Sequence, residues 1–297
     1  MPQPQFLFPA GSRFGGDNLV LHATGRRHVV NDFAGPLSIK TVVRGEVQWI
    51  VGNRHLLVDS NTFLVLADGQ RYSMNIDSAK PVETCCVFFR SGFVEEVAQD
   101  ATTPLEASLD FPWRDAPQLA FLSRLHSDSD RAFLPNIWSL ADRCSEELQP
   151  SSFEEDFLKL SENVLMFYRE VKTEFLRVPA AKASTRQELF RRLQIAREYL
   201  HESVGRRISL EEVSREACIS RYHLHRAFRR VFRLTPHAYV TALRLNRARS
   251  LLQSGRPVTD VAMDIGFTSV SAFTRLFRSR YGVPPSSVPK IRKIGQA

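Results

Sequence analysis

The 297-residue sequence contains only four cysteines, Cys85, Cys86, Cys144 and Cys218. Their spacing matches neither a disulfide framework nor a zinc motif, so we expect reduced thiols in a cytoplasmic protein. Cys85 and Cys86 are adjacent in a strand-like run, so their side chains point to opposite faces and do not share a pocket. We interpret these two as buried, inert thiols and Cys218 as a structural residue in a turn.

Long apolar runs are also absent, since no stretch approaches the roughly 18–20 residues that a membrane helix requires. The chain begins MPQPQFLFPAGSRF, which lacks the basic and apolar segments of a signal peptide. We therefore expect no membrane segment and a cytoplasmic location. Hydrophobic residues make up 43% of the chain, which permits a substantial core, and the length suggests two domains.

Negative charge is scarce in the second half of the chain. Residues 184–297 contain 22 Lys and Arg against eight Asp and Glu, whereas residues 1–183 contain 18 against 24. This asymmetry is typical of a regulatory domain joined to a nucleic-acid-binding domain. The only lysines in the basic half are Lys290 and Lys293, and the planar guanidinium of arginine suits bidentate contacts to phosphate and guanine.

The front half has the pattern of an antiparallel β domain. Between about residues 19 and 90, turn signals separate the runs LSIKTVV, VQWIV, TFLVLA, RYSMNI and ETCCVFF. Turns that recur about every 8–12 residues predict a sandwich or barrel.

From about residue 115 to 176 the period becomes helical, with an apolar stripe from Phe153 to Phe175. This stripe either packs on its own barrel or forms a dimer seam. The following segment, residues 177–186, reads RVPAAKASTR and has no stripe, so it predicts an interdomain linker. The predicted domains are therefore residues 1–176 and 187–297.

The basic half contains an internal repeat. One copy begins at Leu210 and reads LEEVSREACISRYHLHRAFRRVFRLTP, and the other begins at Val258 and reads VTDVAMDIGFTSVSAFTRLFRSRYGVPP. Each copy has a short helix, a tight turn with a small residue, and a longer helix. This is the layout of a helix-turn-helix, whose second helix lies in the major groove of DNA.

Acidic residues are absent from both second helices. None occurs between Arg221 and Arg233 or between Thr268 and Arg280, whereas a solvated helix normally contains acids for i,i+4 pairs. We therefore expect the basic faces to bind double-stranded DNA, because a DNA major groove admits a helix and the RNA groove does not. Ser220 and Thr268 are predicted helix caps, and Leu276 is predicted to face inward.

Residues 188–289 resemble the DNA-binding domain of AraC/XylS-type transcriptional regulators. The resemblance rests on IAREYLHE, FRLTPHAY, LRLNRARSLLQSG and PVTDVAMDIGFTSVSAFTRLFRSRYGVPP. It implies seven helices, with two helix-turn-helix units joined by a rigid helix from about Pro236 to Gln253. Arg233 departs from the family, which usually has glycine at this position.

The resemblance implies which side chains contact DNA. The base-reading residues would be Tyr222, His225, Arg226, Val270, Ser271, Thr274 and Arg275. Bidentate guanine contacts by Arg226 and Arg275 would each contribute roughly 1–3 kcal/mol of discrimination. The residues expected to contact phosphate are Arg221, Arg229, Arg230, Arg249 and Arg278. Simple solvation is the alternative for Arg229 and Arg230.

The front half resembles the cupin-like sensor domains that precede this module in many family members. That resemblance implies a small-molecule effector inside the barrel and dimerisation through the following helices. The candidate effector contacts are Arg44, Trp49, His55, Arg71 and Tyr72. A metal site is not expected, because His22, His28 and His55 are scattered and form no His-x-His pair.

The predicted fold class is two-domain α+β, with an N-terminal all-β cupin-like barrel followed by helices and a C-terminal all-α domain with two helix-turn-helix units. The predicted function is a sequence-specific DNA-binding transcriptional regulator, a homodimer under effector control, with RNA polymerase as a candidate partner. We expect no enzyme activity, catalytic residue, metal or cofactor. The alternatives are a front half that serves only dimerisation or interaction, and an enzyme, either a barrel oxygenase or a cysteine-based alkyl acceptor for DNA repair.

Overall fold

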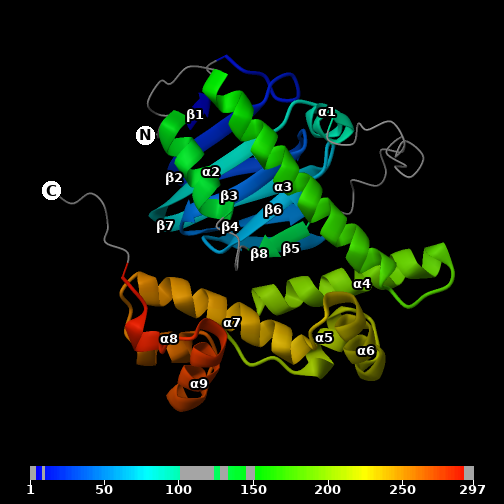
Figure 1. The fold of residues 1–297 in the computed structure, drawn as a ribbon, viewed down its shortest axis with the longest axis vertical. Coiled ribbons are helices and arrows are strands. Elements are labelled where there is room, and N and C mark those ends of the chain that lie inside the picture. The colour runs from blue at the N-terminus through cyan, green and yellow to red at the C-terminus, as the bar shows by residue number, and fades with distance from the viewer. Residues whose placement is uncertain (1–4, 9–10, 101–123, 128–132, 145–150, 291–297) are drawn as a thin grey trace. The chain divides into compact units, whose positions relative to one another are not determined.

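The computed structural model of the chain (Figure 1) describes residues 5–8, 11–100, 124–127, 133–144 and 151–290. The chain divides into two compact units, Met1–Thr173 and Glu174–Ala297. The first contains an antiparallel sheet followed by helices, and the described part of the second is helical. The predicted fold class is therefore confirmed.

The first unit contains an eight-stranded antiparallel sheet. Its strands are β1 (Gln5–Phe8), β2 (Leu19–Ala34), β3 (Ser38–Arg44), β4 (Glu46–Val51), β5 (Arg54–Asp59), β6 (Thr62–Leu66), β7 (Arg71–Phe88) and β8 (Arg124–Ser127). They follow the order β1-β2-β7-β3-β6-β8, and β4 pairs with both β5 and β7. Because β5 also lies against β3 and β6, the sheet curls into a nearly closed barrel.

Strand β7 connects the two sides of this barrel. It pairs with β2 along most of its length, with β4 near its beginning and with β3 near its end. The runs RYSMNI and ETCCVFF, which the sequence analysis separated, belong to this one strand. Pro81 lies between them, where the β2 register shifts between Gly25 and Arg27; strands accommodate proline at such irregularities because a ladder hydrogen bond is already missing there.

The first unit also contains the helices α1 (Phe93–Asp100), between β7 and β8, and α2 (Phe133–Cys144), after β8, and α3 (Ser151–Leu176) follows α2. Figure 1 shows α2 and α3 across one face of the sheet. The stripe on α3 is buried within the single chain, where Phe157 contacts Phe89. The stripe therefore packs on its own barrel, and the dimer-seam interpretation is wrong for it. Strand β8 also lies inside the region that the sequence period marked as helical, because a four-residue strand is too short to alter that period.

The second unit contains both predicted helix-turn-helix units, α5–α6 and α8–α9. Its helices are α4 (Ala183–Glu202), α5 (Leu210–Glu216), α6 (Arg221–Phe232), α7 (Pro236–Gln253), α8 (Val258–Asp264), α9 (Val270–Tyr281) and a 3₁₀ helix (Pro285–Ser287). The connecting helix α7 has the predicted bounds. The described residues thus form six α-helices and a 3₁₀ helix here, where the resemblance implied seven helices. Helix α4 begins inside the predicted linker, residues 177–186, because Ala183 already starts its first turn.

The two helix-turn-helix units lie at opposite ends of α7 (Figure 1). Phe228 and Phe232 of α6 contact Tyr239 in the first turns of α7. Tyr281 of α9 donates a hydrogen bond to Asn246 Oδ1 in the second half of α7, at 2.7 Å. Since α7 has 18 residues, it spans about 27 Å at 1.5 Å per residue.

Serine side chains begin both second helices. The Ser220 hydroxyl accepts a hydrogen bond from the His223 amide, which confirms the predicted cap. In the second helix-turn-helix unit the cap is Ser269, whose hydroxyl accepts a hydrogen bond from the Ala272 amide. The predicted Thr268 cap is therefore wrong by one residue, since an N-cap oxygen must reach the amide two or three positions along. Leu276 is also 37% exposed, so it lies outside the buried face.

The first helix-turn-helix unit has two non-glycine residues at positions where the second helix-turn-helix unit has glycine. Cys218 in the turn has φ 52° and Arg233 after α6 has φ 63°, whereas Gly266 and Gly282 have φ 80° and 75°. This left-handed region costs an ordinary residue roughly 1–2 kcal/mol because the Cβ approaches the backbone. The first helix-turn-helix unit therefore contains backbone strain that the second helix-turn-helix unit lacks.

We expect Arg233→Gly to raise the free energy of unfolding by about 1 kcal/mol, because glycine removes the left-handed penalty. Urea denaturation of the full-length protein, followed by the helical circular dichroism signal, measures this change. Arg233→Ala is the matched control, since it removes the charge but keeps Cβ. An equal gain in Arg233→Ala would show that charge, not backbone strain, is responsible.

We expect Ser269→Ala to lower the free energy of unfolding by about 1 kcal/mol, because the Ala272 amide loses its acceptor. Thr268→Ala serves as the neighbouring control and leaves the stability nearly unchanged. The same denaturation experiment compares the two variants, and a larger loss in Thr268→Ala would contradict the assignment of the cap.

Candidate nucleic-acid interface

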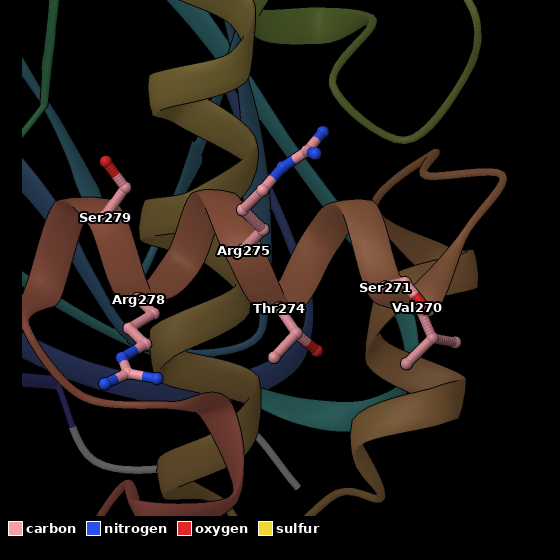
Figure 2. A pocket seen from close by; sticks show the side chains of 6 residues that line it. All are labelled: Val270, Ser271, Thr274, Arg275, Arg278 and Ser279. Atoms are coloured by element: carbon pink, nitrogen blue, oxygen red, sulfur yellow. The ribbon is translucent and has the colours of Figure 1, made fainter.

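One face of helix α9 forms an open groove on the protein surface (Figure 2). The groove is lined by Val270, Ser271, Thr274, Arg275, Arg278 and Ser279. These include every residue of α9 that the sequence analysis assigned to base or phosphate contacts. The opposite face is held in the core by Phe273 and Phe277, whose side chains are fully buried. The burial of one face fixes which side chains the helix presents outward.

The two arginines of this groove reach in different directions. Figure 2 shows the guanidinium groups of Arg275 and Arg278 on diverging side chains, and both arginines follow Thr274 along the helix. Both arginines are exposed, whereas Val270 and Thr274 are half-buried. A helix lying in a major groove could thus direct one arginine to a base edge and another to the backbone.

Helix α6 has the same division. Leu224, Phe228 and Val231 are buried against the rest of the unit. The predicted contact residues on the other face are all exposed, and they are Arg221, Tyr222, His225, Arg226, Arg229 and Arg230. Tyr222 is 76% exposed, which is a large fraction for an aromatic side chain and leaves it available to a partner.

The arginines on these two faces differ from their neighbours in charge pairing. Elsewhere in the unit, Arg206 pairs with Glu212 at 2.7 Å and Arg256 pairs with Asp264 at 2.5 Å. Within the described part of the chain, no acidic group pairs with the arginines of the two outward faces, which are Arg226, Arg229, Arg230, Arg275 and Arg278. Their positive charge is therefore not neutralised by any acidic group of the described residues.

Two predicted phosphate contacts have partial partners. Arg221 lies 3.9 Å from the Glu211 carboxylate, a distance that gives a weak, exposed pair. The Arg249 guanidinium lies 5.2 Å from the centre of the Tyr281 ring. Both side chains are exposed, so they remain accessible at the edges of the two outward faces.

Arg244 is a structural arginine that the sequence analysis did not single out. Its guanidinium donates hydrogen bonds to the carbonyl oxygens of Val204 and Arg206, which joins α7 to the segment after α4. A Cβ on Gly266 would lie 3.0 Å from the same guanidinium. The close approach therefore adds a second reason, besides its positive φ, for glycine in this turn.

The barrel of the first unit contains a partly open cavity of about 120 Å³ between β2, β3, β4 and β7. Among the predicted effector contacts, Trp49 and Tyr72 line it. Arg44, His55 and Arg71 lie outside the lining: Arg44 is paired with Glu83, His55 is exposed, and Arg71 forms a bidentate pair with Asp32. Alternation along β5 and β7 places His55 and Arg71 on the face opposite that of their neighbours Leu56 and Tyr72. Arg44 lies at the end of β3, after a register shift that follows Val42.

Lys40 is the cavity residue that the sequence analysis missed. It lies in β3 and is only 1% exposed. The sequence feature that could have indicated this was a lysine in the middle of the apolar run LSIKTVV. Its neighbours Ile39 and Thr41 point to the other face of the strand, so Lys40 points to the barrel interior. Single lysines on strands are usually solvent-exposed, which is why the pattern did not point to the interior.

The cysteines have the predicted arrangement in the barrel. Cys85 lies on the face covered by α2, where its Sγ is 3.8 Å from the Ile137 carbonyl oxygen. Cys86 is on the opposite face and lines the cavity, where burial raises the pKa of its thiol. Both are buried, and Cys218 is exposed in the turn of the first helix-turn-helix.

No three or more metal-ligating side chains gather in the part of the chain that the structure covers. Among the helices it describes, none is long and apolar enough to cross a membrane.

Comparison with known proteins identifies the repeat-containing half. A helix-turn-helix domain family matches residues 213–290. The probable transcriptional regulator LumQ of Photobacterium leiognathi is 30% identical over 89 residues, which cover 30% of this chain and 36% of that protein. The XylDLEGF operon transcriptional activator 2 of Pseudomonas putida is 31% identical over 101 residues, covering 33% of this chain and 64% of that protein.

Among solved structures, a probable AraC family transcriptional regulator from Rhodopseudomonas palustris is 29% identical, with a TM-score of 0.32. The match covers 33% of this chain and 94% of that one. The chain thus spans well under two thirds of LumQ, and the similarity concerns one domain. Together with the two helix-turn-helix units of the structure, the sequence matches support the predicted resemblance: the C-terminal half of the chain carries a helix-turn-helix domain similar to those of transcriptional regulators such as LumQ and the XylDLEGF operon activator.

Proposed function

We propose that the protein is a sequence-specific DNA-binding transcriptional regulator in which α6 and α9 enter successive segments of the major groove. The observation that supports this most directly is the set of arginines without acidic partners on the outward faces of both helices. Helix α7 is about 27 Å long, and one turn of DNA is about 34 Å. A connecting helix of this length supports a geometry in which both reading helices contact one face of the duplex.

Each outward side chain has a role that follows from its chemistry. Arg226 and Arg275 are the proposed guanine readers, because a guanidinium can donate to both O6 and N7. Tyr222, His225, Ser271 and Thr274 complete the polar base contacts, and Val270 offers apolar contact to a thymine methyl group. The proposed phosphate contacts are Arg221, Arg229, Arg230, Arg249 and Arg278.

The first unit is proposed to control this activity by binding a small molecule in the barrel cavity, which Trp49 and Tyr72 line. A ligand shifts a DNA-binding equilibrium only through different affinities for the two states. A homodimer, contact with RNA polymerase and a cytoplasmic location complete the proposal. A front half without a ligand would leave DNA binding intact and unresponsive to any metabolite, so titration with metabolites separates these alternatives.

Selection of duplexes from a random pool tests the proposal. The full-length protein is expected to enrich a consensus with two elements about one helical turn apart. In Arg275→Ala we expect the preference at one base pair to relax and specific binding to weaken by about 1–3 kcal/mol. An unchanged consensus would show that Arg275 does not read a base, and retention of all duplexes alike would contradict the sequence-specific function.

Arg230→Ala, in the first helix-turn-helix unit, is the variant to compare with Arg275→Ala. A phosphate contact carries no sequence information, so we expect all duplexes to be bound more weakly by a similar factor. Measured against salt concentration, the logarithm of the affinity should fall with a slope about 0.9 shallower than in the wild type. A change in the selected consensus, with an unaltered salt slope, would instead assign Arg230 to base reading.

A further inference from the structure

The barrel cavity contains a buried cation without an acidic partner. Lys40 of β3 is 1% exposed and lies opposite Cys86 of β7 in the sheet register. Within the described residues, no carboxylate lies within ion-pair distance of its Nζ. An unpaired charge removed from water is costly, so this position is unusual for a residue with only a packing role.

The ammonium group has partners that hold it without neutralising it. Nζ donates a hydrogen bond to the Tyr72 hydroxyl oxygen at 3.1 Å. It also lies 3.6 Å from the centre of the Phe88 ring and 4.7 Å from that of Tyr72. These ring faces stabilise the cation, and two N–H groups together with the Tyr72 O–H proton remain able to donate to a ligand.

The site carries a net positive charge at neutral pH. Burial lowers the pKa of Lys40 to about 8, so most of the ammonium is protonated at pH 7. Burial raises the pKa of the Cys86 thiol and of the Tyr72 hydroxyl, which keeps both neutral. Arg27 and His28 of β2 also line the cavity, and neither adds negative charge.

The remainder of the lining is mainly apolar. It includes Leu21, Val30, Trp49, Met74, Ile76 and Val82. The volume of about 120 Å³ is close to that of an apolar protein cavity of about 150 Å³ that accepts benzene. A ligand that matches this cavity therefore has one acceptor end and about six carbon atoms in total.

We propose that the barrel cavity binds a small monocarboxylate, whose carboxylate accepts hydrogen bonds from Lys40 and Tyr72 while its apolar body contacts the Trp49 and Met74 side of the cavity. A single cation and a single hydroxyl at the buried end match one carboxylate group. This inference rests on the proposed function, because it names the chemical class of the effector for that same cavity.

Calorimetric titration of the full-length protein with hexanoate tests the assignment, with 1-hexanol as the uncharged ligand of similar size. We expect saturable binding of one hexanoate per chain and at least about tenfold weaker binding of 1-hexanol, because the alcohol cannot neutralise the ammonium. Equal affinity for both ligands, or no saturable binding of hexanoate, would overturn the proposal.

Variants locate the binding. Lys40→Met should reduce hexanoate affinity by at least about tenfold and should raise the melting temperature of the ligand-free protein, because the desolvated charge is gone. Lys80→Met removes an exposed lysine of the same barrel and should leave hexanoate affinity unchanged. Full hexanoate binding by Lys40→Met would overturn the assignment. If Lys40→Met does not fold, Tyr72→Phe decides: loss of the hydroxyl should weaken hexanoate several-fold, and unchanged affinity overturns the proposal.

The duplex selection separates this inference from the proposed function. A protein that selects a DNA consensus but binds no hexanoate would refute the carboxylate assignment alone. A protein that binds hexanoate through Lys40 but retains all duplexes alike would refute sequence-specific DNA binding and leave the cavity assignment standing.

Discussion

The packing of two recognition helices onto the ends of α7 is the constraint on which the C-terminal half depends. Tyr239, in the first turn of α7, contacts two aromatic rings of α6, and the Tyr281 hydroxyl of α9 donates a hydrogen bond to Asn246 of α7. Thr235 caps α7 and Pro236 occupies its first turn, where a proline costs no hydrogen bond. A single rigid helix thereby sets both the distance and the relative orientation of the two basic faces, so neither unit can choose its position on a partner independently.

Local patterns in the sequence predicted much of this half of the molecule. The repeat and the Ser220 cap follow from periodicity and from residues close together in the chain, whereas the bounds of α7 came from the resemblance to AraC/XylS-type regulators. The barrel was less predictable, because β7 reads as two strands separated by a proline-containing segment, and only its pairing with β2, β3 and β4 shows that it is continuous. The position of Lys40 is likewise a property of the closed sheet, since its burial depends on strands that are distant in the sequence.

The two helix-turn-helix units reach the same fold with different backbone costs. Gly266 and Gly282 supply the left-handed conformations of the second unit, whereas Cys218 and Arg233 adopt them in the first. Arg233 adds a cation at the end of a helix, where positive charge is favourable near the carbonyl groups. The first helix-turn-helix unit thus has more positive charge and more backbone strain. The second helix-turn-helix unit has a turn without that strain, in which Gly266 closely approaches Arg244.

The position of Lys40 has a mechanical consequence for the barrel. Its backbone pairs with Cys86 near the end of β7, while its ammonium group reaches Tyr72 near the beginning of the same strand. One side chain therefore links two distant parts of the same strand across the interior of the barrel. A molecule inserted between these two groups replaces that link, so the charge of the interior is coupled to a contact that holds the two ends of β7 together.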